Sequence, residues 1–247
     1  GTRQMRTRPA ITVAFLVGGL LASCATAAPE PEPRPADAPP PKGFLWSVDT
    51  PSGTSWLLGS VHVRAQDAPP LDPKLDEAFD ATDALVVEAV FQPNDPMLQA
   101  KAIRLGMLPP GQSLSGLMSE EMHARLTEQC RALQLPVAAL EPMRPWFAGI
   151  TLAAAHMQAH GLTAERGVDQ HFIARAVPDV DEDPEKPTMG LESAEYQLEL
   201  LAGLPEEIQL LSLEEQLADN ERRTVAGQPS DAAELVALWE TGDVEAV

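Results

Sequence analysis

The pattern of apolar and polar positions predicts that a folded domain begins with a β-hairpin at Gly43. Residues 43–48 and 54–62 are both rich in large apolar side chains. The stretch between them, Thr50-Pro51-Ser52-Gly53, has the composition of a tight turn. We therefore expect two strands over these ranges, joined by a short connection.

A helix and a further strand follow the hairpin. Asp72 before Pro73 is typical of a helix start. The apolar residues that follow at the spacing of one helical face are Leu75, Ala78 and Phe79. Residues 84–90 then form an apolar run that predicts a buried strand. Strand, helix and strand in this order make a βαβ unit, so strands 54–62 and 84–90 are expected to run parallel.

From residue 91 onward the pattern is mainly helical. The predicted helices are one after Ser119, one over 145–160, one that ends at Ala176, and three over 194–202, 206–218 and 231–239. A short strand is predicted at 189–192. These elements predict an α/β fold of α+β-like character, in which a small mixed sheet with a βαβ unit carries a large helical insertion.

The first residues of the chain predict export. A basic start with Arg6 and Arg8 is followed by an apolar run over 10–20 and by Leu21-Ala22-Ser23-Cys24. This layout resembles a bacterial lipoprotein signal, in which the cysteine becomes the lipidated first residue of the mature chain. The alternative is a plain secretory signal cut after Ala28, with Cys24 discarded. On either interpretation the protein leaves the cytoplasm, and we expect it in the bacterial cell envelope.

Composition divides the chain into three parts. After the predicted signal peptide of residues 1–23, residues 24–42 carry seven prolines and almost no large apolar side chain. Such a segment cannot bury enough apolar surface to fold, which is typical of an extended linker. Residues 43–247 form the predicted domain.

The net charge limits the partners. The chain has 17 Lys and Arg residues against 37 Asp and Glu residues, a formal net charge of -20. Such a surface repels phosphate backbones, so we expect no nucleic acid partner. It also excludes attraction of a basic patch to the membrane, which leaves a lipid on Cys24 as the expected membrane contact.

The sharpest candidate chemistry is the pair His62 and Glu88. Each lies near the carboxyl end of a predicted strand. If the two strands are parallel neighbours, these ends meet at the same edge of the sheet, where α/β proteins bind ligands. An imidazole and a carboxylate there suit a shared divalent metal ion, or a base and its orienting partner. The alternative is that both are polar residues where a strand meets water.

Two other features favour ordinary structural roles. His156 and His160 have the spacing of helical zinc motifs, but no glutamate follows the first histidine. Histidines in the last turn of a helix also interact favourably with the helix dipole. Cys130 lies on an apolar helical face, which predicts a buried and inert thiol.

The order of several short motifs resembles the TraB/GumN family, which includes the Tiki-type proteases. The matching segments are 43–48, Gly59 to His62, Val86-Val87-Glu88, Trp146, Gly167-Val168-Asp169 with Ala176, 190–197, and Trp239 with Gly242-Asp243. Each motif is weak by itself, but together they span residues 43–243. The resemblance implies an α/β core with an inserted helical region and a metal-dependent hydrolase or peptidase activity.

The resemblance also implies a site and a missing part of it. In the family pattern the first G-x-x-H, here Gly59 to His62, and the glutamate of the next strand, here Glu88, belong to the site. A second G-x-x-H after an Arg-Asn pair is also part of the pattern, and this chain has neither. We therefore expect the chain to lack the family's C-terminal part and half of the implied metal site.

The sequence thus predicts an envelope lipoprotein with metal-dependent hydrolase or peptidase chemistry, of which this chain by itself carries only half of the implied metal site. His62 and Glu88 are the expected catalytic residues and ligands of a divalent metal ion, and a peptide or small molecule is the expected substrate. The alternative is a non-catalytic envelope lipoprotein that binds a ligand or a protein. A further alternative is a helical scaffold whose Leu-rich residues 194–218 pack on a partner.

Overall fold

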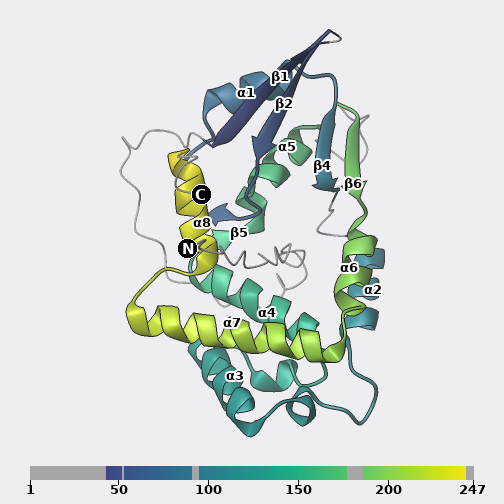
Figure 1. Cartoon of the computed structure of the whole chain (residues 1–247), viewed down its shortest axis with the longest axis vertical. Coiled ribbons are helices and arrows are strands. Elements are labelled where there is room, and N and C mark those ends of the chain that lie inside the picture. Colours follow the sequence, from purple (N-terminus) through teal and green to yellow (C-terminus); the bar gives the residue numbers. More distant parts are fainter. Residues whose placement is uncertain (1–42, 52, 91–94, 177–185, 243–247) are drawn as a thin grey trace, which may run out of the picture.

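The computed structural model describes residues 43–51, 53–90, 95–176 and 186–242. The predicted signal peptide, the predicted linker and Cys24, the predicted lipidation site, lie outside these residues. Strands occupy the upper part of the molecule and most of the helices occupy the lower part (Figure 1). This arrangement confirms the predicted mixed α/β class, with a helical insertion between two strands.

The strands form pairs rather than one sheet. Their bounds are β1 Phe44–Thr50, β2 Gly53–Gly59, β3 Arg64–Ala65, β4 Leu85–Ala89, β5 Leu162–Thr163 and β6 Thr188–Glu192. The predicted hairpin is confirmed, because β1 and β2 pair antiparallel from Phe44 opposite Gly59 to Thr50 opposite Gly53. The two-residue strands β3 and β5 form a second antiparallel pair, which the sequence did not predict.

The two strands of the predicted βαβ unit are not direct neighbours. Within the described residues β2 pairs only with β1, and β4 pairs parallel with β6 instead of with β2. The directions were inferred correctly, since β2 and β4 run the same way (Figure 1). The order of elements along the chain predicts the direction of each strand. Which strands pair depends on which strand edges are already occupied by other strands. Here β6, which follows the helical insertion, occupies one edge of β4.

The helices account for most of the chain. The α-helices are α1 Pro73–Asp80, α2 Pro96–Gly106, α3 Glu120–Ala132, α4 Pro145–Ala159, α5 Val168–Ala176, α6 Ala194–Ala202, α7 Glu206–Ala226 and α8 Asp231–Thr241. Short 3₁₀ turns are η1 Leu114–Leu117, η2 Val137–Ala139 and η3 Ala164–Arg166. None of the helices in the described ranges combines the length and the apolar character needed to span a membrane.

The predicted helix starts are confirmed by their caps. The side chain of Asp72 accepts a hydrogen bond from the backbone N–H of Lys74 at 3.0 Å, with Pro73 in the first turn. Ser119 accepts one from the N–H of Met122 at 3.2 Å. Such caps satisfy N–H groups that have no partner within the helix. Helix α2 was not predicted, and α7 continues eight residues beyond its predicted end at Ala218.

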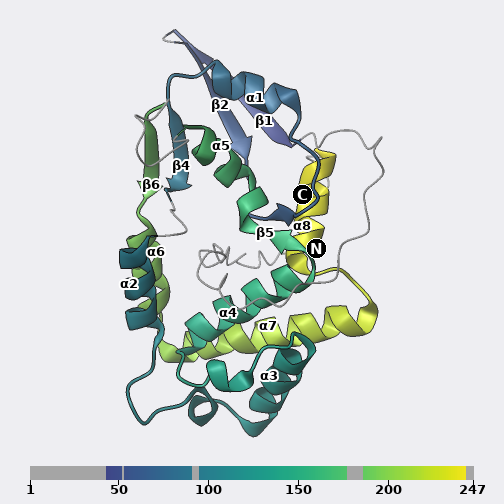
Figure 2. The ribbon, with the colours of Figure 1, turned by 180° about the vertical axis from the view of Figure 1, so that it is seen from behind.

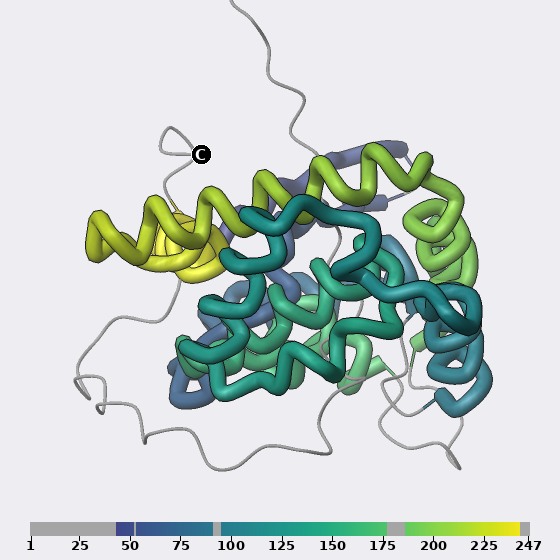
Figure 3. Tube along the Cα trace, turned by 90° about the horizontal axis from the view of Figure 1, so that it is seen from below, coloured from purple at the N-terminus to yellow at the C-terminus, as the bar shows by residue number. Residues whose placement is uncertain are grey.

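The lower half has a closed helical core. Helix α7 lies along α3 and α4 (Figure 3), and the three helices share a cluster of buried residues. Leu152 of α4 and Leu217 of α7 are fully buried in it, as is Cys130 of α3. On one side of the molecule, α2 packs against α6 through Leu98, Ala102 and Leu198 (Figure 2).

A second core lies beneath the strands and leads to the site. It joins α1, α5 and α8 through residues that include Leu75, Phe172 and Trp239. The indole N–H of Trp239 donates a hydrogen bond of 2.6 Å to the carbonyl oxygen of Gly59, at the end of β2. Helix α8, far away in the sequence, therefore fixes the chain just before His62.

Candidate functional site

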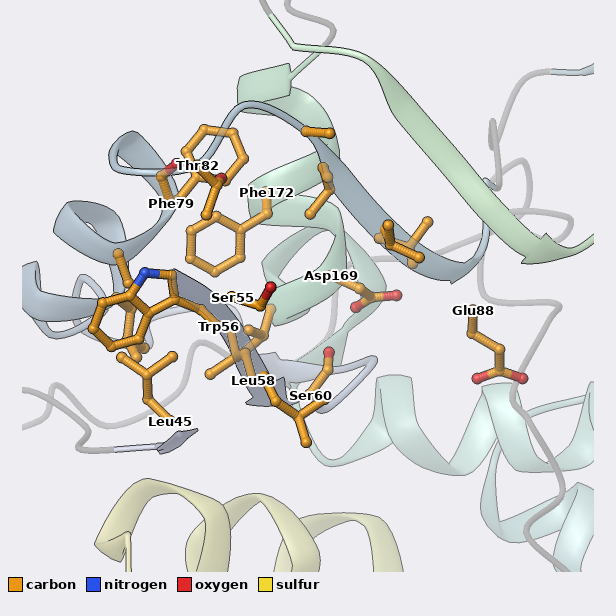
Figure 4. Close-up of a pocket in the computed structure, with 18 of the residues that line it drawn as sticks. Leu45, Ser55, Trp56, Leu58, Ser60, Phe79, Thr82, Glu88, Asp169 and Phe172 are labelled. Atoms are coloured by element: carbon orange, nitrogen blue, oxygen red, sulfur yellow. Dashed lines mark hydrogen bonds between the residues drawn. The ribbon is translucent and has the colours of Figure 1, made fainter. Parts of the chain in front are cut away.

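The structure brings His62 and Glu88 to one cavity. His62 follows the end of β2 by three residues, and Glu88 lies in β4. Both line a cavity of about 1000 Å³ between the two strands. Figure 4 shows Glu88 and Asp169 in this cavity. Their nearest atoms, Nε2 of His62 and Oε2 of Glu88, are 3.9 Å apart. This separation is too long for a hydrogen bond, so both atoms can contact a third group placed between them.

Asp169 holds the imidazole from its other side. Its Oδ2 lies 2.9 Å from Nδ1 of His62. An ionised carboxylate only accepts hydrogen bonds, so Nδ1 carries the proton and the neutral ring presents the lone pair of Nε2 toward Glu88. Asp169 comes from the first turn of α5, which puts it 107 residues from His62 in the chain.

A glycine allows this approach. A Cβ atom on Gly167 would lie 2.4 Å from the carbonyl oxygen of His62, well inside any real contact. The N–H of Val168 donates a hydrogen bond of 2.9 Å to the carbonyl oxygen of Val61. The start of α5 therefore packs directly on the backbone of 61–62. This contact explains the glycine of the Gly167-Val168-Asp169 motif, because a side chain at that position would clash with the backbone of His62.

Charge and burial act on His62 in opposite directions. The hydrogen bond to Asp169 raises the pKa of His62, and the negative charges of Asp169 and Glu88 add to this effect. Partial burial lowers it, but the net shift is upward. The protonated imidazole therefore persists to a higher pH than that of an ordinary histidine.

Glu88 is oriented by an amide. The side-chain N–H of Gln197 donates a hydrogen bond of 2.6 Å to Oε1 of Glu88. Gln197 belongs to α6 and is buried, whereas about half of the Glu88 side chain is exposed. A second carboxylate, that of Glu192 at the end of β6, lies 3.5 Å from the same amide nitrogen. Gln197 thus fixes one oxygen of Glu88 and leaves Oε2 toward His62.

The donors present suit a divalent cation only in part. His62 Nε2 and the Glu88 carboxylate are two suitable donors, and Asp169 on Nδ1 is the outer partner that metal-binding histidines usually have. Oδ1 of Asp169 is buried and has no hydrogen-bond partner, so the site has capacity for a further donor or cation. However, the described residues contain no cluster of three or more His, Cys, Asp or Glu side chains placed to hold a metal ion.

The other histidines do not join this site. His160 Nδ1 lies 2.7 Å from the carbonyl oxygen of His156, and His156 Nε2 lies 3.4 Å from the amide oxygen of Gln129. These contacts are those of a helix end, in agreement with their interpretation as structural residues. His123 pairs with Glu141 at 3.1 Å in the helical half.

Sequence reasoning missed the roles of Asp169 and Gln197. Both occur in motifs that contribute to the family resemblance, but spacing along the chain says nothing about contact across 107 or 109 residues. The one signal available was the glycine of Gly167-Val168-Asp169, which marks a close backbone approach. Asp243, from the other quoted motif, lies outside the described residues.

The candidate site lies in a part of the chain that has known relatives. The sequence model of the TraB/PrgY/gumN family matches residues 44–247, which is nearly the whole predicted domain. The chain belongs to the TraB/PrgY/gumN family. The resemblance inferred from short motifs is thereby confirmed, and the site residues His62, Glu88, Asp169 and Gln197 all lie within the part that matches the family.

Two relatives carry the printed name "Uncharacterized protein YbaP". The protein from Shigella flexneri is 29% identical over 152 residues, covering 62% of this chain and 53% of its own. The protein from Escherichia coli (strain K12) is 29% identical over 150 residues, covering 61% and 52%. This member of the TraB/PrgY/gumN family therefore spans about half the length of the curated relatives it matches. No solved structure matches it.

Proposed function

We propose that this TraB/PrgY/gumN family protein is a hydrolase of peptidase type whose chemistry is centred on His62. One observation carries the proposal: Asp169 holds Nδ1 of His62 at 2.9 Å, while Nε2 faces the Glu88 carboxylate at 3.9 Å inside a cavity. An imidazole fixed by a carboxylate on one side and open toward a cavity on the other is typical of catalytic histidines.

Each side chain then has a role. Asp169 fixes the orientation and tautomer of the ring. Gln197 orients Glu88 by donating to Oε1, so that Oε2 is available to accept a proton from a water molecule in the cavity. His62 Nε2 presents its lone pair at the same place, where it would ligate a divalent metal ion. Groups that move protons in this way contribute about 10²–10⁴-fold to a rate.

The proposal includes a divalent metal ion as cofactor. His62 Nε2 and the Glu88 carboxylate are the residues that would hold it. The ion would supply Lewis-acid chemistry, lowering the pKa of a coordinated water molecule toward neutrality. A catalytic zinc ion commonly takes three protein ligands. The pair is thus a partial donor set, and further ligands would have to come from outside it.

Hydrolysis of a diverse peptide mixture by the whole protein, followed by mass spectrometry, tests the proposal. We expect chelation of divalent ions to abolish cleavage, and His62→Ala and Glu88→Gln to lower it at least about a hundredfold. His160→Ala, which changes the exposed histidine directly after α4, is the matched control and should leave cleavage unchanged. Equal cleavage by the His62→Ala variant would overturn the assignment.

A second candidate function is non-catalytic binding. The exposed apolar side chains that line the cavity, such as Trp56 and Val86, favour it, because exposed apolar surface often marks a binding site. A binding protein would retain its ligand after chelation and would show no turnover. Cleavage and ligand binding measured with and without a chelator therefore separate the two functions.

We further propose that the protein is exported and anchored to the cell-envelope membrane by a lipid on Cys24. The support is the basic start, short apolar run and small residues before that cysteine. Intact mass measurement should detect acylation in the membrane fraction, and Cys24→Ser should release the protein from it. An unmodified thiol at Cys24 in the mature protein would contradict the anchor.

A further inference from the structure

The residues around His62 alternate between the cavity and the core. Ser60 and His62 line the cavity. Val61 and Val63, which alternate with them, are buried and are only 5% and 8% exposed. The segment 59–64 therefore has one face toward the cavity and one toward the core. The position of the imidazole in the cavity depends on what holds the core face.

The core face of this segment is held by α8. The indole N–H of Trp239 donates a hydrogen bond of 2.6 Å to the carbonyl oxygen of Gly59, and Trp239 shares a cluster of buried residues with Val61. About one turn earlier in α8, Val236 shares a second buried cluster with Val63. Figure 1 shows α8 beside the lower end of the hairpin, from which the segment leads. Contacts with α8 thus begin at the end of β2 and continue past the imidazole.

An ion pair connects the end of the segment to the same helix. Arg64 is 3% exposed, and its guanidinium lies 3.5 Å from Oε1 of Glu240. The guanidinium also lies over the indole ring of Trp239, 5.9 Å from the ring centroid. It donates a further hydrogen bond of 2.9 Å to the carbonyl oxygen of Pro69. Two neighbouring residues of α8 therefore contact the chain on both sides of His62.

The same segment also contacts α5, which carries Asp169. The N–H of Val168 donates a hydrogen bond of 2.9 Å to the carbonyl oxygen of Val61. Helix α5 thus supplies the carboxylate that lies 2.9 Å from the imidazole, whereas α8 holds the backbone from which the imidazole extends. No residue of α8 is among the described residues that line the cavity. An effect of α8 on the site is therefore indirect and passes through the backbone of the segment.

We propose that Trp239 and Glu240 of α8 are positioning residues for His62. By holding the backbone on both sides of the imidazole, they keep the ring aligned with the carboxylate of Asp169. The assignment rests on the proposed function, in which the chemistry is centred on His62. A displacement of about 1 Å at a reacting group can lower a rate about a hundredfold. Neither residue lines the cavity, so its loss should lower kcat and leave KM nearly unchanged.

Trp239→Phe tests the assignment, because it keeps an aromatic ring and removes the N–H that donates to Gly59. Nitrogen-15 NMR of His62, with a chelator present and at a pH at which the ring is neutral, reports which ring nitrogen carries the proton. In the wild type we expect Nδ1, which faces Asp169. In the variant a measurable share of the protein should carry the proton on Nε2, because the ring is no longer held against the carboxylate.

Two further measurements on Trp239→Phe distinguish positioning from a general loss of stability. Hydrogen exchange of the Val168 N–H, which bonds to the segment, should become at least about tenfold faster relative to that of Leu152 in the helical core. For a peptide that the whole protein cleaves, kcat should fall at least about tenfold and KM should change less than about twofold. The NMR and exchange measurements require no cleavage, so failure of the proposed function would not be mistaken for failure of this assignment.

Three variants complete the test. Trp46→Phe makes the same substitution at a 44% exposed residue of β1 outside the cavity lining, and Leu126→Val lowers stability from within the helical core. Both should leave the tautomer of the imidazole unchanged. Glu240→Gln removes the charge of the ion pair and should shift the tautomer in the same direction as Trp239→Phe, and it serves alone if that variant does not fold. An unchanged tautomer in either α8 variant would overturn the role of that residue, and an equal change in Leu126→Val would overturn both.

Discussion

The helical half and the strand half of this protein differ in how far their side chains are buried. In the half formed by α3, α4 and α7, Leu152 and Leu217 are 0% exposed and the core is continuous. In the strand half, no residue of β1, β2 or β4 is buried, and Leu57 of β2 is 64% exposed. Among the described residues the helical half has a closed core, whereas β2 and β4 are each paired along one edge only.

The difference follows from how the two kinds of element satisfy their backbone. A helix pairs its own N–H and C=O groups and needs only one packed face. A strand needs a neighbour on each edge and cover on its faces. Helices α1 and α5 cover part of the strands, but within the part of the chain that the structure describes only one edge of β2 and of β4 is paired. The candidate site lies where this pairing is incomplete, so its chemistry is accessible.

The largest loss of stability should come from a cavity-creating substitution in the helical core. Leu152→Ala removes a fully buried side chain of α4 and should lower the free energy of unfolding by about 2–5 kcal/mol. Leu57→Ala, the same change in the exposed strand β2, should cost no more than about 0.5 kcal/mol. Chemical denaturation measures both. Equal losses would show that the two halves do not differ as described.

The next effect concerns the contact between α5 and the chain at His62. Gly167→Ala places a Cβ atom 2.4 Å from the carbonyl oxygen of His62, so the backbone has to shift, at a cost of about 1–3 kcal/mol. Gly116→Ala is the control, since its Cβ would meet only the Ser113 hydroxyl at 3.3 Å. Thermal or denaturant unfolding should rank the first variant well below the second. The reverse ranking would contradict the close packing of Gly167.

A smaller effect should follow from loosening the base of the hairpin. Trp239→Phe removes the N–H that donates to the carbonyl of Gly59, a loss of about 1 kcal/mol in stability. Trp56→Phe, the same substitution at a 40% exposed residue of β2, should change stability by less than about 0.5 kcal/mol. Urea unfolding of the pair is the measurement. A larger loss of stability for Trp56→Phe than for Trp239→Phe would contradict the role of the Trp239 hydrogen bond in holding the hairpin.

The last prediction concerns protonation rather than packing. Asp169→Asn removes the charged acceptor that raises the pKa of His62, so this pKa should fall, with burial then lowering it further. The raised pKa contributes stability that is present below the unfolded-state value of about 6.5 and is lost as the pH rises through the folded-state pKa. The stability gap between wild type and variant should therefore be largest in acid and shrink with rising pH.

NMR titration of His62 and unfolding at several pH values check this prediction. Asp80→Asn is the control, because Asp80 pairs with Arg175 in the last turn of α5, whereas Asp169 lies in the first turn, so this change should leave His62 unaffected. An unchanged His62 pKa in the Asp169→Asn variant would show that the hydrogen bond at 2.9 Å does not govern its protonation.

The sequence by itself determined the elements whose signals are local. The turn at 50–53, the caps at Asp72 and Ser119 and the apolar periodicity of α3 each depend on neighbouring residues, and the structure confirms them. The buried position of Cys130 follows from the same periodicity, and that burial raises its pKa to about 11. The family also followed from the sequence, because it depends on the order of short motifs.

Only the tertiary structure decided which of these elements meet. It placed β6 rather than β2 beside β4, and it brought Asp169 and Gln197, more than a hundred residues away, to His62 and Glu88. The physical reason is that strand pairing and side-chain contact depend on which edges and faces remain open after the whole chain has packed. That competition leaves no periodic signal in the sequence. A glycine that close packing requires, such as Gly167, marks such a contact in the sequence without identifying the partner.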